Sequence, residues 1–385
     1  YAYFLKIATV DWNAQIIVTT AVQCFESLYS NRRSKLRKLH NMADSILVFD
    51  EAHMLPLKYM QPCLEGISFV TKCLNSEAIM LTATMPNYNI LFETYGNKNS
   101  GIVSLVDYYE DFKKFEKCEY KNLGIVSYDM LMMRIIEQPS SLIVVNSKHK
   151  AVELFSRLSL TGVMVYHLST YMTGFDRMRT IKQIRDKLIQ LESDYPDLTG
   201  VPNERRIVVV STSLIEAGVD LDFYTVYREL AGVDNIIQAG GRCNREGKRS
   251  DAITYIFEFE DDAYKPKNDD CRSEITKGLL NEYSSITDAN CITEYYRRTY
   301  VVRKDELISN ALFKMCNNPR SIPFKTYSDE FSLIDSNNQS VFIAQDQESE
   351  MLLNQLKKGE GVLLRKLQKY TVSVTQKELT ELIRL

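Results

Sequence analysis

An acidic pair, Asp50 and Glu51, follows the apolar run from Ile46 to Phe49, and His53 comes two residues after Glu51. A run of this kind predicts a buried strand, which would place both carboxylates at the carboxyl end of that strand. There an aspartate can hold Mg²⁺ through the ion's water shell, and an adjacent glutamate can accept a proton from an attacking water. On its own, such a pair is more often a solvated turn. The pattern indicates nucleotide hydrolysis only if other segments support it.

Two further polar segments follow predicted strands. T-A-T, from Thr82 to Thr84, ends one apolar run, and alone it is typical of a cap for the next helix. The segment S-T-S-L-I-E-A-G-V-D-L-D follows the run I-V-V-V, and it places several polar residues and a glycine in one strand-to-helix turn. These are Thr212, Glu216, Gly218, Asp220 and Asp222.

A fourth segment, Q-A-G-G-R-C-N-R, carries Gln238, Gly241, Arg242 and Arg245. If this segment is helical, its two arginines lie three residues apart and point the same way, so both guanidinium groups could meet one polyphosphate. Alone, this spacing is common, and surface ion pairs would be the better interpretation. The fixed order of all four segments makes a chance assembly improbable.

Short apolar runs alternate with longer helical patterns through most of the chain, which predicts parallel α/β sheets of doubly wound architecture. Later in the chain we expect helices around 294–315 and 348–357, and strand-like runs at 341–344 and at T-V-S-V. The predicted strands of the α/β part are 16–18, 46–50, 79–82, 142–146, 163–167, 207–210, 225–228 and 253–257.

Composition places the protein among ordinary globular chains. Its 385 residues are 45% hydrophobic and 25% charged, with a net charge of −3, so nucleic-acid binding would have to come from local patches. One candidate patch is the basic run from Arg32 to Lys38, for which phosphate contact and a solvated face remain equally plausible. Eight scattered cysteines without a C-x-x-C pair favour reduced thiols and a cytoplasmic location, and no apolar run is long enough to span a membrane.

The four segments resemble motifs II, III, V and VI of superfamily 2 helicases, whose core is two RecA-like domains that close on ATP. Three connecting segments are similar to the signature helicase-nuclease of type I CRISPR systems: T-T-A-V-Q-C-F-E-S-L, N-R-R-S-K-L-R-K-L-H-N-M-A-D-S and H-L-S-T-Y-M-T. The resemblance covers most of residues 15–260. It implies two RecA-like parallel-sheet domains, the first incomplete and in residues 1–105, and the second, together with the linker that precedes it, in residues 106–262. A mixed, mainly helical accessory domain would follow in residues 263–385.

The resemblance also implies roles for individual residues. Asp50 would coordinate Mg²⁺, Glu51 would activate water, and His53 would couple the nucleotide site to the second domain. Thr82 and Thr84 would link ATP hydrolysis to movement of the nucleic-acid strand. The implied nucleic-acid contacts are Thr20, Gln23 and Thr212. The implied nucleotide contacts are Gly218, Asp220 and Gln238, with Arg242 and Arg245 as arginine fingers.

These motifs include no phosphate cradle, which is the loop that binds the phosphates of a nucleotide. No segment fits the P-loop pattern G-x-x-x-x-G-K-[ST], and the nearest match, from Gly241 to Ser250, has its glycines six apart and lies inside the arginine motif. We therefore expect a carboxyl-terminal fragment, with the P-loop and a nuclease domain upstream of Tyr1, that is inactive by itself.

The expected activity of the intact protein is ATP-dependent movement on single-stranded DNA in CRISPR interference, with the surveillance complex as partner. Two alternatives stay open. The first is another superfamily 2 DNA or RNA helicase. The second is a non-catalytic binding module, which would have no physical need of Glu51, Arg242 and Arg245.

Overall fold

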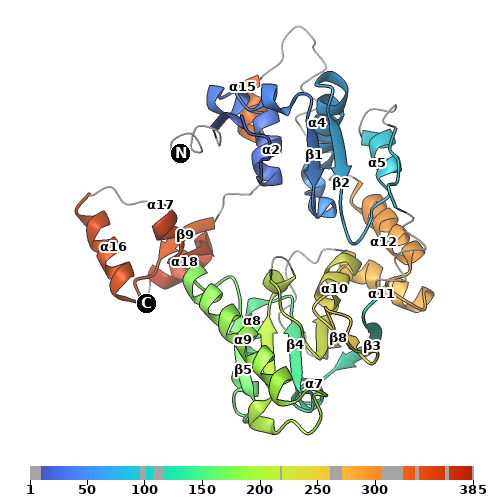
Figure 1. Ribbon diagram of the computed structural model, residues 1–385, viewed down its shortest axis with the longest axis vertical. Coiled ribbons are helices and arrows are strands. Elements are labelled where there is room, and N and C mark those ends of the chain that lie inside the picture. Colours follow the sequence, from blue (N-terminus) through green and yellow to red (C-terminus); the bar gives the residue numbers. More distant parts are fainter. Residues whose placement is uncertain are drawn as a thin grey trace. The chain divides into compact units, whose positions relative to one another are not determined.

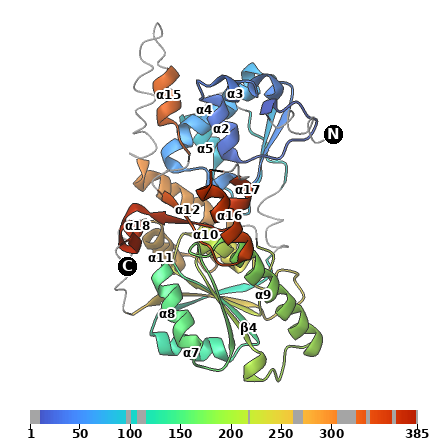
Figure 2. The ribbon, with the colours of Figure 1, turned by 90° about the vertical axis from the view of Figure 1, so that its left-hand side faces the viewer.

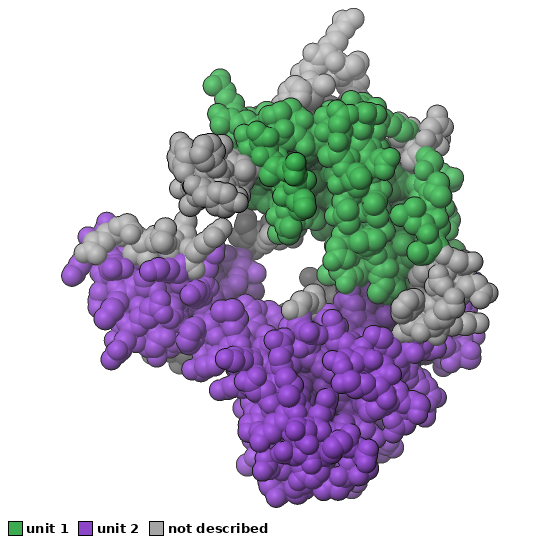
Figure 3. Space-filling view, in the orientation of Figure 1, with its two compact units in different colours: residues 1–108, 292–335 green, residues 109–291, 336–385 purple. Residues whose placement is uncertain are grey.

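The computed structural model describes residues 10–95, 101–106, 116–216, 219–260, 271–304, 324–333, 338–359 and 364–383. The chain forms two compact units, shown in Figure 3. The first combines residues 1–108 with 292–335, and the second combines residues 109–291 with 336–385. The segment 263–385, which we expected to form one accessory domain, is thus shared between the two units.

The second unit contains a six-stranded sheet in which every neighbouring pair is parallel. Three central strands, β4, β6 and β7, are buried at every residue, which explains the apolar stretches Leu142–Val144 in β4 and Ile207–Val210 in β6. The strand order is β3-β8-β7-β4-β6-β5 (Figure 1). The strands are β3 (Glu119–Val126), β4 (Ser140–Val144), β5 (Met164–Leu168), β6 (Ile207–Ser211), β7 (Thr225–Glu229) and β8 (Ile253–Phe259).

Helices cover both faces of this sheet (Figure 2). On one face, α7 (Tyr128–Ile136) and α8 (Lys148–Leu158) bury side chains against the strands. On the other face, α9 (Gly174–Asp194) and α10 (Val233–Gly240) do the same. The doubly wound α/β class predicted from the alternating pattern is confirmed. A further helix of this unit is α11 (Arg272–Glu282).

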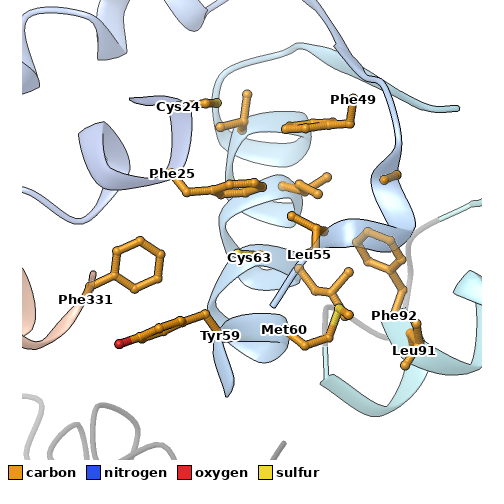
Figure 4. Close-up of a cluster of buried hydrophobic side chains, with 14 of the residues drawn as sticks. Cys24, Phe25, Phe49, Leu55, Tyr59, Met60, Cys63, Leu91, Phe92 and Phe331 are labelled. Carbon is orange, nitrogen blue, oxygen red and sulfur yellow. The ribbon is translucent and has the colours of Figure 1, made fainter. Parts of the chain in front are cut away.

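The first unit contains a small parallel sheet, β1 (Ile46–Phe49) and β2 (Glu77–Met80), with a helical core beside it. Phe25 stacks on Phe49 with ring centroids 5.4 Å apart, and Phe331 lies 4.4 Å from the ring of Tyr29. Figure 4 shows this buried cluster. Its helices are α2 (Ala21–Leu28), α3 (Arg33–Leu36), α4 (Met60–Cys73), α5 (Tyr88–Tyr95) and α15 (Phe324–Glu330); α12 (Ala289–Val302) contributes from residue 292 onward.

The carboxyl-terminal part of the second unit is an antiparallel pair of strands with three helices. The predicted strand-like runs and the helix at 348–357 are confirmed to within a few residues, whereas residues 305–315 of the expected helix at 294–315 lie outside the described ranges. These elements are β9 (Asn338–Phe342), α16 (Gln347–Lys357), α17 (Leu364–Gln368), β10 (Thr371–Thr375) and α18 (Gln376–Ile383). Single 3₁₀ turns occur at Leu39–Met42, Ala52–Met54, Leu57–Tyr59, Asn203–Arg205 and Ser213–Ile215.

One predicted strand was wrong, and one strand was not predicted. Residues 16–18 form no strand, and the side chains of Ile16 and Val18 are 85% and 95% exposed, because no described segment pairs with them. Conversely, β3 lies in a stretch that we interpreted as a linker. Its apolar pattern is broken by Lys121 and Asn122 because it is an edge strand with a partly exposed face. Among the described helices, none combines the length and the apolar character needed to cross a bilayer.

Candidate functional site

The ends of β1 and β2 bring two of the predicted motifs together in the first unit. Phe49 pairs with Met80 in the parallel register. The ladder continues beyond the strands, since Leu81 N–H donates to the Phe49 carbonyl at 2.9 Å and Ala52 N–H donates to the Leu81 carbonyl at 3.0 Å. The segments D-E-A-H and T-A-T therefore leave the sheet side by side.

Glu51 occupies an unusual backbone conformation at this point. Its φ of 52° and ψ of 44° are left-handed, a region that non-glycine residues enter at a cost and that is enriched at functional sites. The preceding carboxylate stabilises the turn, because Glu51 N–H donates to Asp50 Oδ1 at 3.0 Å. Both acidic side chains remain accessible, and that of Glu51 is 49% exposed.

The His53 side chain is buried between the two motifs. Its Nδ1 lies 2.6 Å from Thr82 Oγ1 and 3.4 Å from Glu51 Oε2. The Thr82 hydroxyl donates to the Thr84 carbonyl at 3.0 Å and accepts from Thr84 N–H at 3.2 Å. His53 Nδ1 and the Thr82 hydroxyl share a hydrogen bond whose direction depends on the histidine tautomer. Four predicted residues, Glu51, His53, Thr82 and Thr84, thus form one connected cluster.

Thr20 and Gln23, which we predicted to contact a nucleic-acid strand, lie at the start of α2. Thr20 Oγ1 caps this helix by accepting from Gln23 N–H at 3.2 Å. The amide oxygen of Gln23 accepts from Lys38 Nζ at 2.8 Å. Burial, with help from nearby Lys35, lowers the pKa of Lys38, and its ammonium also lies 4.8 Å from the ring centre of Trp12.

The side chains of the basic run from Arg32 to Lys38 therefore differ in burial and in pairing. Lys38 is buried, and Lys35 pairs with Glu26 at 2.8 Å. Arg32, Arg33 and Arg37 are exposed. Any phosphate contact of this run would depend on the three arginines.

In the second unit, the turn after β6 is held by a buried ion pair. Glu216 Oε1 lies 3.0 Å from Arg228 Nε, and Asn235 Nδ2 donates to Glu216 Oε2 at 2.8 Å. Burial raises the pKa of Glu216, and the Arg228 charge opposes that rise. Thr212, at the amino end of the same turn, is buried, and its N–H donates to the Leu168 carbonyl at 3.2 Å. Sequence reasoning did not single out Arg228 or Asn235, although a charged residue at the end of the apolar strand β7 was an available signal.

The two predicted arginine fingers do not share a helix, contrary to our expectation. Helix α10 ends at Gly240, and both arginines lie in the turns that follow. Arg242 is buried and donates to the main-chain carbonyls of Ile215 at 3.2 Å and Glu216 at 2.8 Å. Its guanidinium therefore clamps the turn after β6.

Arg245 has a different environment. Its Nε lies 2.7 Å from Asp220 Oδ1, with the two side chains 41% and 72% exposed. Its main-chain N–H donates to Asp222 Oδ1 at 2.9 Å. Gln238 is partly exposed on α10, and Gly218 lies outside the described residues. The structure thus gathers the second set of motifs in one unit, with Arg245 accessible and Arg242 buried.

The acidic pair fits a hydrated magnesium nucleotide. Within the described ranges, no group of three or more His, Cys, Asp or Glu side chains could hold a metal ion. Mg²⁺ commonly keeps several waters and binds through one or two carboxylates together with substrate phosphates. The exposed carboxylate of Asp50 at the end of β1 suits that mode, which needs no protein cage.

Sequence comparisons identify relatives of this chain. Residues 137–248 match the family model described as CRISPR-associated nuclease/helicase Cas3, C-terminal. A CRISPR-associated nuclease/helicase Cas3 of Haloferax volcanii is 41% identical over 85 residues, which are 22% of this chain and 8% of the relative. A putative CRISPR-associated nuclease/helicase Cas3 of Methanocaldococcus jannaschii is 24% identical over 225 residues, covering 54% of this chain and 28% of the relative.

Solved structures extend the similarity to most of the fold. The crystal structure of T. fusca Cas3-ADP matches with a TM-score of 0.66 at 16% identity, covering 93% of this chain and 50% of that chain. A chain of a CRISPR RNA-guided surveillance complex, pre-nicking, matches with a TM-score of 0.63 at 15% identity, covering 94% and 54%. The chain thus spans about half the length of these proteins. The family model, the curated relatives and the shared fold together support a relationship between this chain and Cas3 helicase-like proteins.

Proposed function

We propose that this chain is the part of an ATP-dependent single-stranded DNA translocase that couples hydrolysis to movement, and that the intact protein acts with a nuclease in CRISPR interference. The observation that carries the proposal is the contact between His53 and Thr82 at 2.6 Å. This contact joins the D-E-A-H segment at the end of β1 to the T-A-T segment at the end of β2. A protein that uses hydrolysis to drive movement requires such a link. A solvated turn at Asp50 and Glu51 would have no need of that contact.

In this proposal, Glu51 is the base that accepts a proton from the attacking water. Its exposed carboxylate lies next to buried His53, whose Nδ1 is 3.4 Å from Glu51 Oε2. Asp50 would hold the water shell of Mg²⁺. When bound, a magnesium nucleotide supplies the phosphoanhydride bond and a cation that neutralises its charge. The residues of the chain would then orient the attacking water, hold its proton and transmit the resulting conformational change to Thr82 and Thr84.

The second unit would supply the cation that stabilises the transferring phosphoryl group. Arg245 is the better candidate for this role because its guanidinium is accessible and its partner Asp220 is exposed. Arg242 would act as a positioning residue, since its guanidinium is buried and already bonds the carbonyls of Ile215 and Glu216. Asp220, Gln238 and Gly218 stay candidate nucleotide contacts, and Thr20, Gln23 and Thr212 candidate DNA contacts.

The phosphate cradle would come from chain outside the 385 residues. Ile46 and Val48 point to one face of β1 and are 63% and 56% exposed. Parallel sheets are normally covered on both faces, so an exposed apolar face on a two-stranded parallel sheet supports further elements that pack over this face. We propose that the part of the same protein that carries the P-loop and the nuclease provides them. A CRISPR surveillance complex would recruit the intact protein.

ATP turnover tests the proposal. We expect the full-length protein to hydrolyse ATP when single-stranded DNA is added, and the 385-residue chain alone to be inactive. Stimulation by RNA instead of DNA would favour another superfamily 2 helicase. Absence of turnover with either nucleic acid would favour a non-catalytic module. DNA-stimulated turnover by the chain alone would contradict a cradle outside it.

A further inference from the structure

A hydroxyl pair connects the T-A-T segment to a helix from much later in the chain. Thr84 Oγ1 lies 3.0 Å from the hydroxyl oxygen of Tyr296, and the two residues are 212 positions apart in the sequence. Both are buried, Thr84 completely. Tyr296 lies on α12, and residues 292–335 pack with the first unit although the chain reaches them only after residues 109–291.

This contact completes a continuous path of short polar contacts. Glu51 Oε2 faces His53 Nδ1, which contacts Thr82 Oγ1, and the Thr82 hydroxyl bonds both the carbonyl and the N–H of Thr84. Thr84 then reaches Tyr296 through its own hydroxyl. His53, Thr84 and Tyr296 are the buried members of this path, and breaking a buried hydrogen bond costs free energy.

The ring of Tyr296 is itself held in place. It packs edge-on against Tyr295 with centroids 5.0 Å apart and stacks on Tyr300 at 5.9 Å, both on the same helix. A displacement of Thr84 therefore cannot be absorbed by a free rotation of this side chain. It is passed to α12.

We propose that Tyr296 is a positioning residue that couples the T-A-T segment to α12, so that the state of the Glu51 site is transmitted to the helix through which the chain re-enters the first unit. This inference rests on the proposed function. Tyr296 does not contact nucleotide or water in this role. It acts through Thr84, and its hydroxyl, rather than its ring, is the essential group.

The test is Tyr296→Phe in the full-length protein, which removes only that hydroxyl. The readout is the ratio of ATP turnover with single-stranded DNA to turnover without it. We expect that ratio to fall about fivefold or more, the size of effect that one buried hydrogen bond can carry, with the KM for ATP little changed. The matched control is Tyr88→Phe, another buried tyrosine of the first unit, whose hydroxyl has no hydrogen-bond partner among the described residues. It should keep the wild-type ratio.

A second pair of variants tests the path independently. Thr84→Ser keeps the hydroxyl and should retain more coupling than Thr84→Val, which removes it. Adding Tyr296→Phe to Thr84→Val should produce little further loss if the two side chains act through one contact. Additive losses would overturn the inference.

The remaining outcomes are also decisive. A wild-type ratio in Tyr296→Phe would refute the coupling role while leaving the proposed function intact. A Tyr296→Phe protein that does not fold would show that the hydroxyl serves stability rather than coupling. A wild-type protein without any DNA stimulation would count against the proposed function itself.

Discussion

The Arg242 guanidinium lies 2.8 Å, Nη2 to oxygen, from the main-chain carbonyl of Glu216 inside the second unit. Replacing Arg242 with alanine removes this bond and the one to Ile215, and leaves both carbonyls without their charged donor. We expect the free energy of unfolding of the second unit to fall by about 2–4 kcal/mol, as measured by urea denaturation of the 385-residue chain.

Lysine at position 242 should restore little of that loss, because one ammonium cannot reproduce the planar fork. The control is Arg205→Ala, since the ion pair of Arg205 with Asp194 is long, at 3.8 Å, and exposed. That variant should change stability by at most about 1 kcal/mol. Equal midpoints for the two alanine variants would show that Arg242 is not a clamp.

Arg245→Ala should lower ATP turnover and leave stability nearly unchanged. Because its ion pair with Asp220 is exposed, we expect a stability change below about 1 kcal/mol. Turnover of the full-length protein should fall by about 10³-fold, as for an arginine finger, while nucleotide affinity changes much less. Arg185→Ala is the matched control, since Arg185 also contacts Asp220, through the main-chain oxygen at 3.2 Å. Unchanged turnover in Arg245→Ala would make this arginine structural.

Glu51→Gln should leave nucleotide binding intact and abolish ATP turnover in the full-length protein. Glutamine keeps the shape of the side chain and the left-handed backbone, but it cannot accept the proton of the attacking water. Single-turnover hydrolysis and equilibrium nucleotide binding measure the two effects separately. Glu77→Gln, at the exposed start of β2, is the control and should behave as wild type. Normal hydrolysis by Glu51→Gln would refute the role of Glu51 as base.

Glu294 on α12 should give the protein an acid-sensitive contribution to stability. Hydrogen bonds from Arg297, and then from Arg298, lower the pKa of Glu294 from 4.5 to about 2. A carboxyl whose pKa is lower in the folded state stabilises that state fully above its unfolded pKa, and this stabilisation is lost as the pH falls toward the folded pKa. The stability difference between wild type and Glu294→Gln should therefore be constant above about pH 5 and shrink from there toward pH 2.

Thermal unfolding at several pH values measures this difference. In an Arg297→Gln background, the effect of Glu294→Gln should be smaller, because the largest cause of the shift is already removed. A difference that stays constant down to pH 3 would contradict the assignment.

Much of the second unit could be predicted from the sequence because its strands are buried on both faces. The runs in β4 and β6 are apolar for that reason, and Glu216 lies in the turn that follows β6, where the Arg242 guanidinium meets its carbonyl. Edge strands lack this signal. β3 carries Lys121 and Asn122 on a partly exposed surface, and its pattern could not be distinguished from a linker.

The site was harder to predict where burial, rather than residue type, decides what a side chain does. Arg242 and Arg245 have the same side chain and belong to the same motif, yet one donates to main-chain carbonyls and the other faces an exposed carboxylate. Sequence spacing could not separate them, because the helix ends at Gly240 before either residue. The Thr84–Tyr296 contact had no sequence signal, since nothing local links residues so far apart.

The discontinuity of the first unit has a consequence for biosynthesis. Its two stretches, 1–108 and 292–335, are separated by the strands of the second unit's sheet, all of which leave the ribosome before residue 292. At about 5–20 residues per second, the gap corresponds to roughly 10–40 seconds of elongation. Throughout that interval Tyr29 and Tyr59 lack Phe331, the aromatic side chain that later covers them. The first unit is therefore completed only after the sheet of the second unit has been made, and its aromatic surface stays uncovered by Phe331 during that interval.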